Sequence, residues 1–194
     1  MKAKALAYNK DIVQNRSADA VMGVVFFVLA TVLSAYVRIP LPGNPVPITL
    51  QTMFVLLAGA VLGRRLGSLS QAGYILLGAL GIPVFQGASS GLAHIMGPTG
   101  GYLFGFIIAA YLVGKATASR ALSAKAIAVY FVLADLLIHV SGAIWLAYIF
   151  RMSAMQAFSA GILAFIPGEI VKVSLAIAIY ARISGRSKEI FPGR

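Results

Sequence analysis

The sequence contains no cysteine, and charged residues make up only 11% of its 194 positions. The lack of cysteine excludes disulfide bonds, zinc–thiolate sites and cysteine nucleophiles. The G-x-x-x-x-G-K-[ST] loop that holds ATP phosphates is missing, and so is the H-E-x-x-H zinc motif. Any energy for moving a solute would therefore have to come from a partner chain or from the solute gradient.

Apolar residues make up 60% of the chain, whereas typical soluble domains are about 45–50% apolar and about 25% charged. No charged residue occurs in the three long runs 20–37, 39–63 and 66–114. A helix of roughly 20 apolar residues crosses the hydrocarbon core of a bilayer. The runs do not alternate at period two, as barrel strands would. The pattern therefore predicts an all-α integral membrane protein with a single domain, residues 1–194.

Turn-forming residues divide these runs into separate spans. The segment 40–47 contains four prolines and cannot be helical. The segment 63–67 places two arginines between glycines, and 86–101 is rich in glycine and serine. The first apolar run is longer than the core of a signal peptide, so we interpret it as a retained helix. We expect about six membrane-spanning helices, near residues 20–37, 48–63, 67–83, 99–116, 126–149 and 157–181.

Basic residues gather at the ends of spans on one side. An even number of spans places both termini on the same side, and of the 16 Lys and Arg residues only Arg38, Arg151 and Lys172 fall elsewhere. The positive-inside rule predicts that both termini are cytoplasmic. The net charge of +11 is expected to reflect this topology and contact with anionic lipid rather than binding of nucleic acid.

Two segments depart from plain lipid-facing helix in their loops. The segment 43–52 runs from a proline-rich loop into a helix with Thr49, Gln51 and Thr52 in its first turns. It fits equally a capped connection or a wall over a site on the outer face. The segment 81–101 combines glycine, proline and serine, and we favour a shaped loop that lines a cavity over a flexible turn.

Ionisable residues within apolar spans are the strongest functional candidates, because each buried charge costs several kcal/mol. Glu169 and Lys172 are three residues apart and so share one helix face, beside Pro167-Gly168, which can break or kink the helix. The alternative is an internal ion pair that fixes helix packing.

Asp135 and His139 form a second pair, four residues apart. We expect each to satisfy the hydrogen bonds of the other or of a neighbour, rather than to form a proton relay.

Five stretches occur in an order and spacing similar to the BioY family, the biotin-specific S components, or substrate-binding subunits, of energy-coupling-factor (ECF) transporters. They are P-V-P-I-T-L-Q-T at 45–52, L-G-R-R-L-G at 62–67, L-G-A-L-G-I-P-V-F at 77–85, G-P-T-G-G-Y-L-F-G-F at 97–106 and I-P-G-E-I-V-K at 166–172. The resemblance covers about residues 20–181. It implies a six-helix S component in the bacterial cytoplasmic membrane, with biotin as its transported ligand and no cofactor.

The resemblance also implies where biotin and partners bind. The pocket is expected to open outward, between the loops after the first and third helices and the outer halves of helices four to six. The candidate biotin contacts are Glu169, Lys172, Gln86, Phe85, Val84, Thr49, Gln51, Tyr102 and His139. The expected partners are a membrane coupling subunit, which the small-residue motif Ala30-x-x-x-Ser34 would dock, and two cytoplasmic ATPases. Some family members occur without the ATPases.

Three residues depart from the family pattern. Glu169 stands where the family usually has Asp, so its carboxylate reaches one methylene further. An aromatic residue is usual near the position of His139, and Asp135 matches no family motif.

Two other classes of function remain open at this point. One is an S component or solitary carrier for another vitamin, which uptake with competing vitamins would reveal. The other is a small intramembrane enzyme that uses Glu169, Lys172, Asp135 or His139, which turnover of biotin by the purified protein would reveal.

Overall fold

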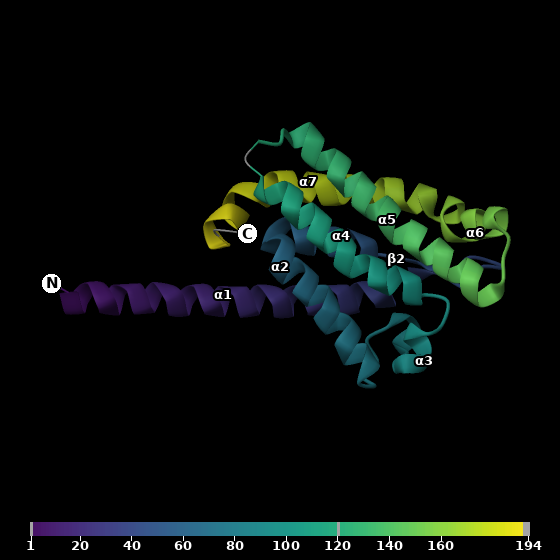
Figure 1. The fold of residues 1–194 in the computed structure, drawn as a ribbon, viewed down its shortest axis with the longest axis horizontal. Coiled ribbons are helices and arrows are strands. Elements are labelled where there is room, and N and C mark those ends of the chain that lie inside the picture. The colour runs from purple at the N-terminus through teal and green to yellow at the C-terminus, as the bar shows by residue number, and fades with distance from the viewer. Residues whose placement is uncertain (1, 120, 192–194) are drawn as a thin grey trace.

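The structure is a bundle of helices, drawn as a ribbon in Figure 1. The computed structural model describes residues 2–119 and 121–191, with side chains from residue 17 onward. The two short strands, β1 Arg38–Ile39 and β2 Ile48–Thr49, pair antiparallel with Arg38 opposite Thr49. The helices are α1 Lys2–Tyr36, α2 Gln51–Ala79, η1 Gln86–Ala88, α3 Leu92–Ile95, α4 Gly100–Ala118, α5 Ala124–Phe150, α6 Ala154–Gly161, η2 Leu163–Phe165 and α7 Ile166–Ile190.

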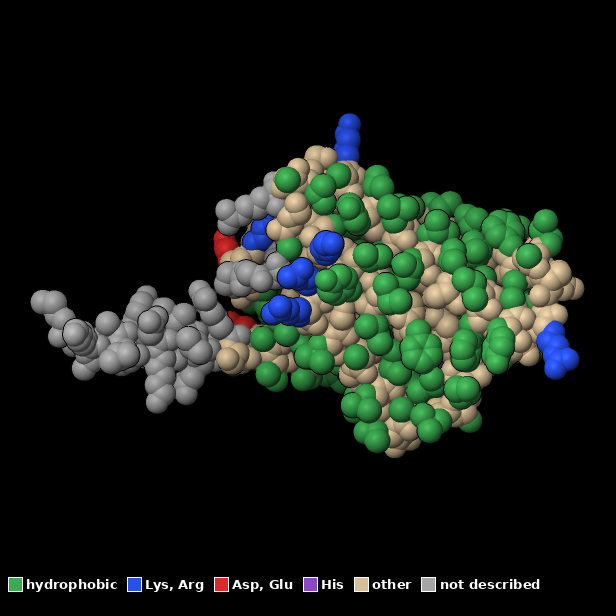
Figure 2. All heavy atoms as spheres, in the orientation of Figure 1, with side chains coloured by type: hydrophobic (Ala, Val, Ile, Leu, Met, Phe, Trp, Pro, Cys, Tyr) green, Lys and Arg blue, Asp and Glu red, His purple; other side chains and the backbone are tan. Residues whose placement is uncertain are grey.

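Apolar helical segments make up most of the bundle. Within the described part of the chain, five segments are long and apolar enough to cross a membrane: Ser17–Tyr36, Gln51–Ala79, Gly100–Ala118, Ala124–Phe150 and Ala154–Ile190. Large apolar side chains cover much of the face seen in Figure 2. Such a surface is costly in water and matches the hydrocarbon of a bilayer. The predicted class, a multi-pass all-α membrane protein, is confirmed.

Helix α2 reverses direction at Gly63. The backbone of Gly63 has φ 81° and ψ 178°, a conformation that only glycine adopts readily. A straight helix would hold Gln51 and Tyr74 about 35 Å apart, yet Gln51 Nε2 donates a hydrogen bond to Tyr74 Oη at 2.7 Å. The two halves of α2 are therefore antiparallel. Counting them separately gives the six helices of the predicted bundle.

The ends of α2 differ from the spans expected at 48–63 and 67–83. The helix begins at Gln51 because residues 48 and 49 form β2. It ends at Ala79, and Gly81 follows with a φ of +94°. Gly59 lets the first half of α2 approach α4 closely, because a Cβ at this position would overlap the carbonyl oxygen of Ala110.

The segment expected as one span at 157–181 contains two helices. Helix α6 begins at a capping box formed by Ser153 and Gln156, and the chain turns at Ile162, with φ −128° and ψ −62°. Pro167, expected to break or kink a helix, lies instead in the first turn of α7, where a missing N–H breaks no hydrogen bond. Glu169 is therefore in the first turn of α7 rather than in the middle of a helix.

The proline-rich segment 40–47 is held across one end of the bundle. Asn44 Nδ2 donates to the carbonyl oxygen of Ala160 at 2.7 Å, and Asn44 Oδ1 accepts from Val46 N at 3.0 Å. At the end of α1, the Tyr36 hydroxyl donates to the carbonyl oxygen of Pro83. These bonds fix the loops that cover the polar interior.

Helix α1 turns Ser34 toward the interior, contrary to the expected docking role. Ser34 is 3% exposed and donates to the carbonyl oxygen of Thr31, whose hydroxyl in turn meets Gln71 of α2. Ala30 is half-buried. The motif therefore offers a partner no exposed serine, because this face packs within the chain. The outward face of α1 carries the large apolar side chains of Val21, Met22, Val25, Phe26, Leu29 and Leu33.

Basic side chains gather at the end of the bundle near which both termini are marked (Figures 1 and 2). The predicted cations Lys2, Lys4, Lys10, Arg16, Arg120 and Arg194 lie outside the described side chains. That this end faces the cytoplasm stays a prediction of the positive-inside rule.

The reversal at Gly63 generates the first testable prediction. We expect Gly63→Ala to destabilise the folded protein by about 1–3 kcal/mol, because an alanine is strained in this backbone conformation. Gly185→Ala is the matched control: Gly185 is an exposed glycine in α7 with open space around it, and alanine there is expected to add about 0.5–1 kcal/mol. Thermal unfolding of both variants in the same detergent measures the difference. Equal melting temperatures would contradict the role of Gly63.

Candidate functional site

One cavity gathers six of the thirteen polar or charged side chains that are buried in the described part of the chain. Its empty space, with the open solvent at its mouth included, is about 470 Å³. It lies between α2, α4, α5, α7 and the loop that follows α2. The lining residues are Val46, Thr49, Gln51, Thr52, Tyr74, Gln86, His94, Thr99, Tyr102, Leu103, Phe106, His139, Phe165, Glu169 and Lys172.

Glu169 is the most heavily bonded group in the cavity. Its Oε1 accepts a short hydrogen bond from Lys172 Nζ, and its Oε2 accepts from the Thr52 hydroxyl at 2.9 Å. Lys172 Nζ also donates to the carbonyl oxygen of Thr49 at 2.8 Å. Glu169 is 7% exposed and Lys172 4%. The pair is thus a buried, hydrogen-bonded ion pair on one wall of the cavity, as the spacing on one helix face predicted.

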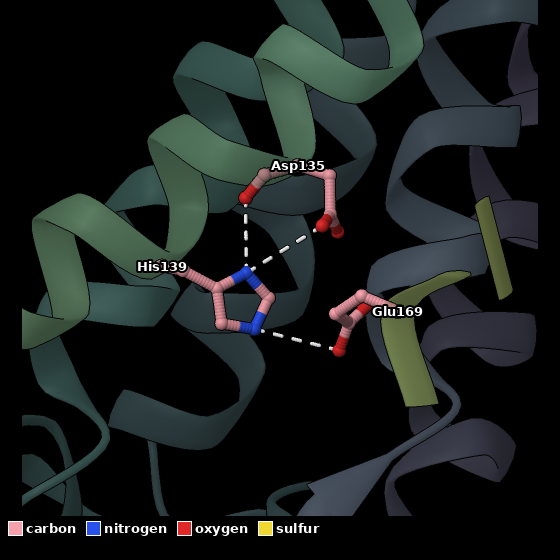
Figure 3. A group of neighbouring side chains, drawn as sticks. All are labelled: Asp135, His139 and Glu169. Atoms are coloured by element: carbon pink, nitrogen blue, oxygen red, sulfur yellow. Dashed lines mark hydrogen bonds and ion pairs between the residues drawn. The ribbon is translucent and has the colours of Figure 1, made fainter. Parts of the chain in front are cut away.

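His139 of α5 extends this wall, and it lies between Asp135 and Glu169, as Figure 3 shows. The imidazole Nε2 of His139 lies 3.4 Å from Glu169 Oε1. Its Nδ1 lies 3.0 Å from the backbone oxygen of Asp135 and 3.7 Å from Asp135 Oδ2. The ring packs edge-on against Tyr102 and beside Phe165. Asp135 lies behind His139 and does not line the cavity.

These groups do not make a good metal site. One ligand atom from each of Asp135, His139 and Glu169 lies within 4.8 Å of the others. However, the ammonium of Lys172 already contacts Glu169 Oε1. A divalent cation would have to displace or face that positive charge, so the donor set fits an ion pair network better than a metal.

The neutral part of the cavity wall comes from β2, α2 and the loop after α2, and it adjoins the charged pair through the Thr49 carbonyl oxygen, which accepts from Lys172. Gln51 Nε2 donates to Tyr74 Oη, and the Thr49 hydroxyl donates to Gln51 Oε1 at 3.1 Å. Gln86 projects from η1. This wall offers amide and hydroxyl groups where the first offers charges.

Val84 and Phe85, expected to contact the ligand, lie behind this wall instead. Phe85 is fully buried, packs edge-on against Tyr74, and stacks on His94 with ring centroids 4.6 Å apart. Val84 is 4% exposed and does not line the cavity. Both shape the site through the residues in front of them, because the loop folds their side chains into the core.

The other seven predicted contacts all line the cavity. These are Glu169, Lys172, Gln86, Thr49, Gln51, Tyr102 and His139. Their contact with a ligand stays a prediction. Eight further lining residues were not among the predicted contacts, because nothing in their spacing points inward; these are Val46, Thr52, Tyr74, His94, Thr99, Leu103, Phe106 and Phe165.

His94 joins the two ends of the loop between α2 and α4. Ser89 donates its hydroxyl hydrogen to the carbonyl oxygen of Gln86, so Ser89 Oγ is free to accept from His94 Nδ1 at 2.8 Å. His94 Nε2 then accepts from the Thr99 hydroxyl at 3.0 Å. This chain of bonds fits the neutral imidazole with its hydrogen on Nδ1. Burial lowers the pKa of His94 below its usual value, which also favours the neutral ring.

The spacing Gly87-Ala88-Ser89-Ser90-Gly91 matches the letters of a serine-hydrolase elbow, G-x-S-x-G, which the sequence analysis also missed. The structure does not support that chemistry. Ser89 follows a 3₁₀ turn rather than a strand, and its proton is donated to Gln86 rather than to His94. His94 faces the Thr99 hydroxyl and no carboxylate orients it.

The burial of His94 generates a pH prediction. Its folded-state pKa is lowered, so the unfolded chain binds the proton first as the pH falls through about 6.5. The contribution of His94 to stability is therefore complete above this pH and is lost below it. We expect the melting temperature of His94→Asn to fall less than that of the native protein between about pH 7 and pH 5. Parallel curves for the two proteins would contradict this.

Comparisons with known proteins agree with the membrane fold. The model of the BioY family matches residues 6–189. The chain is 42% identical over 171 residues to a probable biotin transporter BioY of Pyrococcus horikoshii, and the alignment covers 88% of this chain and 99% of that relative. It is 33% identical over 177 residues to the biotin transporter BioY of Rhizobium etli, and that alignment covers 87% of this chain and 91% of the relative.

A solved structure supports the same relationship. It is described as the crystal structure of the S-component for biotin from an ECF-type ABC transporter, and it aligns with a TM-score of 0.77 at 28% identity. The alignment covers 90% of this chain and 93% of that one. The family model spans nearly the whole chain, and the fold is that of an S component. The chain belongs to the BioY family of transport proteins.

Proposed function

We propose that this chain binds biotin in the cavity between α2, α4, α5 and α7 and delivers it across the cytoplasmic membrane as the substrate-specific subunit of an ECF transporter. The observation that carries the proposal is the cavity itself, in which a buried carboxylate–ammonium pair lies together with amide and hydroxyl groups among apolar side chains. A few convergent polar groups in an apolar hollow are typical of a site for a small organic ligand.

The chemistry of biotin matches the two walls. Its ureido ring offers two N–H donors and a carbonyl, its fused rings are apolar, and its tail ends in a carboxylate. Glu169 can accept ureido N–H bonds, Gln86 can donate or accept, and Lys172 can meet a carboxylate. The rings of Tyr102 and Phe165 supply apolar contact. The polar groups thus complement a ligand with both donors and a negative charge.

The proposed partners are those that membership of the BioY family implies, a membrane coupling subunit and two cytoplasmic ATPases. The chain itself has no phosphate-binding loop, so any use of ATP would fall to such partners. The outward apolar face of α1, which includes Val25, Leu29 and Leu33, is a candidate docking surface for the coupling subunit.

Equilibrium binding of biotin to the purified protein is the primary test. We expect saturable binding that other vitamins do not displace. Cells that express the chain with the coupling subunit and ATPases are expected to accumulate labelled biotin faster than cells with the chain alone. No binding of biotin to folded, monodisperse protein would contradict the proposed substrate, whereas equal uptake in both cell types would contradict only the need for partners.

The charged wall generates a sharper prediction for the same assay. Removing one partner of a buried charge contact typically costs about 2–5 kcal/mol, which is roughly one and a half to three and a half decades of affinity. Lys172→Ala and Glu169→Gln should each weaken biotin binding on this scale, and Glu169→Asp should be milder because it keeps the charge. Lys188→Ala and Glu189→Gln, on the exposed end of α7, are matched controls.

A purely structural ion pair makes a different forecast. On that alternative, Lys172→Ala and Glu169→Gln lower the melting temperature without ligand, and the folded fraction binds biotin with native affinity. Isothermal titration on monodisperse variants distinguishes the two. Near-native affinity in both variants would show that the pair does not bind the ligand.

The proposed orientation has its own test. A reporter fused after residue 194 is expected to show cytoplasmic activity, because the basic side chains gather at the end where both termini lie. Activity of the fusion only outside the cell would reverse the assignment.

A further inference from the structure

We propose that Asp135 and His139 are positioning residues of the ligand site: His139 is held as an imidazolium between Asp135 and Glu169, and in that state it fixes the Glu169 carboxylate in the cavity. The binding part of this inference rests on the proposed function, because biotin is the ligand used to test it. The charge state of His139 is tested without ligand.

Both ring nitrogens of His139 face oxygen atoms that can only accept. Nδ1 faces the backbone carbonyl of Asp135 at 3.0 Å, with Asp135 Oδ2 at 3.7 Å, and Nε2 faces Glu169 Oε1 at 3.4 Å. A neutral imidazole has one N–H and one lone pair. Either neutral tautomer would therefore place a lone pair against an oxygen lone pair. The imidazolium, with both nitrogens protonated, satisfies both contacts (Figure 3).

A proton on Glu169 is the alternative way to satisfy Nε2, and the surrounding donors argue against it. Glu169 Oε1 already contacts the ammonium of Lys172, and Oε2 accepts from the Thr52 hydroxyl. Protonation of Glu169 would weaken its hydrogen bond from Lys172, because a charge-assisted bond of this kind needs the ionised acceptor. Glu169 is therefore the anion, and the proton belongs to His139.

Asp135 supplies the charge that balances this imidazolium. It is 6% exposed, and its Oδ1 has no hydrogen-bond partner among the described residues. An unpaired carboxylate buried in an apolar helix is costly. The nearest cation to Asp135 on its own helix face is His139, four residues on. With all four groups ionised, the charges of Asp135, His139, Glu169 and Lys172 sum to zero.

The other titratable groups around the cluster do not change this balance. Tyr102 of α4 faces the His139 ring, and its hydroxyl donates to the Gly161 carbonyl oxygen. Tyr74 of α2 accepts from Gln51, and Tyr180 of α7 packs against Phe131, one turn before Asp135. His94 lies in the loop that forms the neutral part of the cavity wall. The Tyr180 hydroxyl has no hydrogen-bond partner among the described residues. An ordinary phenol is neutral at pH 7 and the bonds of His94 fit the neutral ring, so no further charge enters the cluster.

The consequence for ligand binding is preorganisation. A glutamate side chain that must be ordered on binding loses rotamer freedom, and that loss weakens affinity. Two hydrogen bonds, from Lys172 and Thr52, and the ion pair with His139 hold the Glu169 carboxylate before the ligand arrives. Contacts between charged groups are strong enough that losing the one from His139 should weaken biotin binding about ten- to a hundredfold.

The charge state can be read directly, because the chain contains only two histidines. Nitrogen-15 spectra of histidine-labelled protein, recorded without ligand at about pH 8, should show one doubly protonated ring and one neutral ring with its hydrogen on Nδ1; an unperturbed imidazole is neutral at this pH. His94→Asn removes the neutral signal and so assigns the other to His139. Asp135→Asn should convert that signal to a neutral ring. Two neutral rings in the native protein would overturn the proposal.

Variants at His139 separate positioning from packing. His139→Gln keeps a neutral donor for Glu169, whereas His139→Phe fills the ring's space beside Tyr102 and Phe165 with no donor. We expect biotin affinity in the order His, Gln, Phe, with Phe about ten- to a hundredfold below the native protein. Equal affinity in the native protein and His139→Phe would overturn the positioning role, even though biotin still binds.

A double variant tests whether Asp135 acts through His139. Once the ring is gone, Asp135→Asn should cause no further loss, so Asp135→Asn with His139→Phe should bind biotin as weakly as His139→Phe alone. Additive losses would overturn the link between the two residues. If the native protein binds no biotin, the proposed function fails, and the spectra still decide the charge state of His139.

Discussion

A carboxylate and an ammonium on one face of α7 must both be satisfied away from water, and the polar interior is arranged around this requirement. Glu169 and Lys172 are almost fully buried. Burying such a pair is favourable only when further hydrogen bonds complete its coordination. Thr52 comes from the start of α2, the Thr49 carbonyl from β2 just before it, and His139 from α5. Three elements that are far apart in sequence therefore meet at one point.

That meeting depends on how the helices begin and turn. Pro167 starts α7 just before Glu169, so the pair occupies the first two turns, close to the loop-covered end of the bundle. The reversal at Gly63 returns the second half of α2 beside the first and brings Tyr74 against Gln51. The cavity lining that results combines a charged part on α7 with a neutral part on β2, α2 and the loop after α2. A ligand with donors at one end and an anionic tail can be complemented by such an arrangement.

The loop between α2 and α4 has a fixed conformation and forms part of the cavity wall. Phe85 fills the core under it, His94 stacks on Phe85, and hydroxyls at Ser89 and Thr99 bond both ring nitrogens. These contacts give the loop a fixed shape next to Gln86. The ring nitrogens of His94 meet two hydroxyl groups and fit a neutral imidazole, whereas those of His139 meet oxygen atoms that only accept. The two histidines of the chain therefore differ in their bonding within one site.

The sequence alone determined the class of the protein, because continuous apolar runs and basic span ends follow from the physics of the bilayer. The spacing of Glu169 and Lys172 also placed them on one helix face, since helical geometry is local. The tertiary structure decided the rest. It turned Ser34 inward, placed Val84 and Phe85 behind the wall, and brought His94 and Thr52 to the cavity. Such placements depend on which helix faces pack together, and residue spacing within a single element carries no information about contacts between elements.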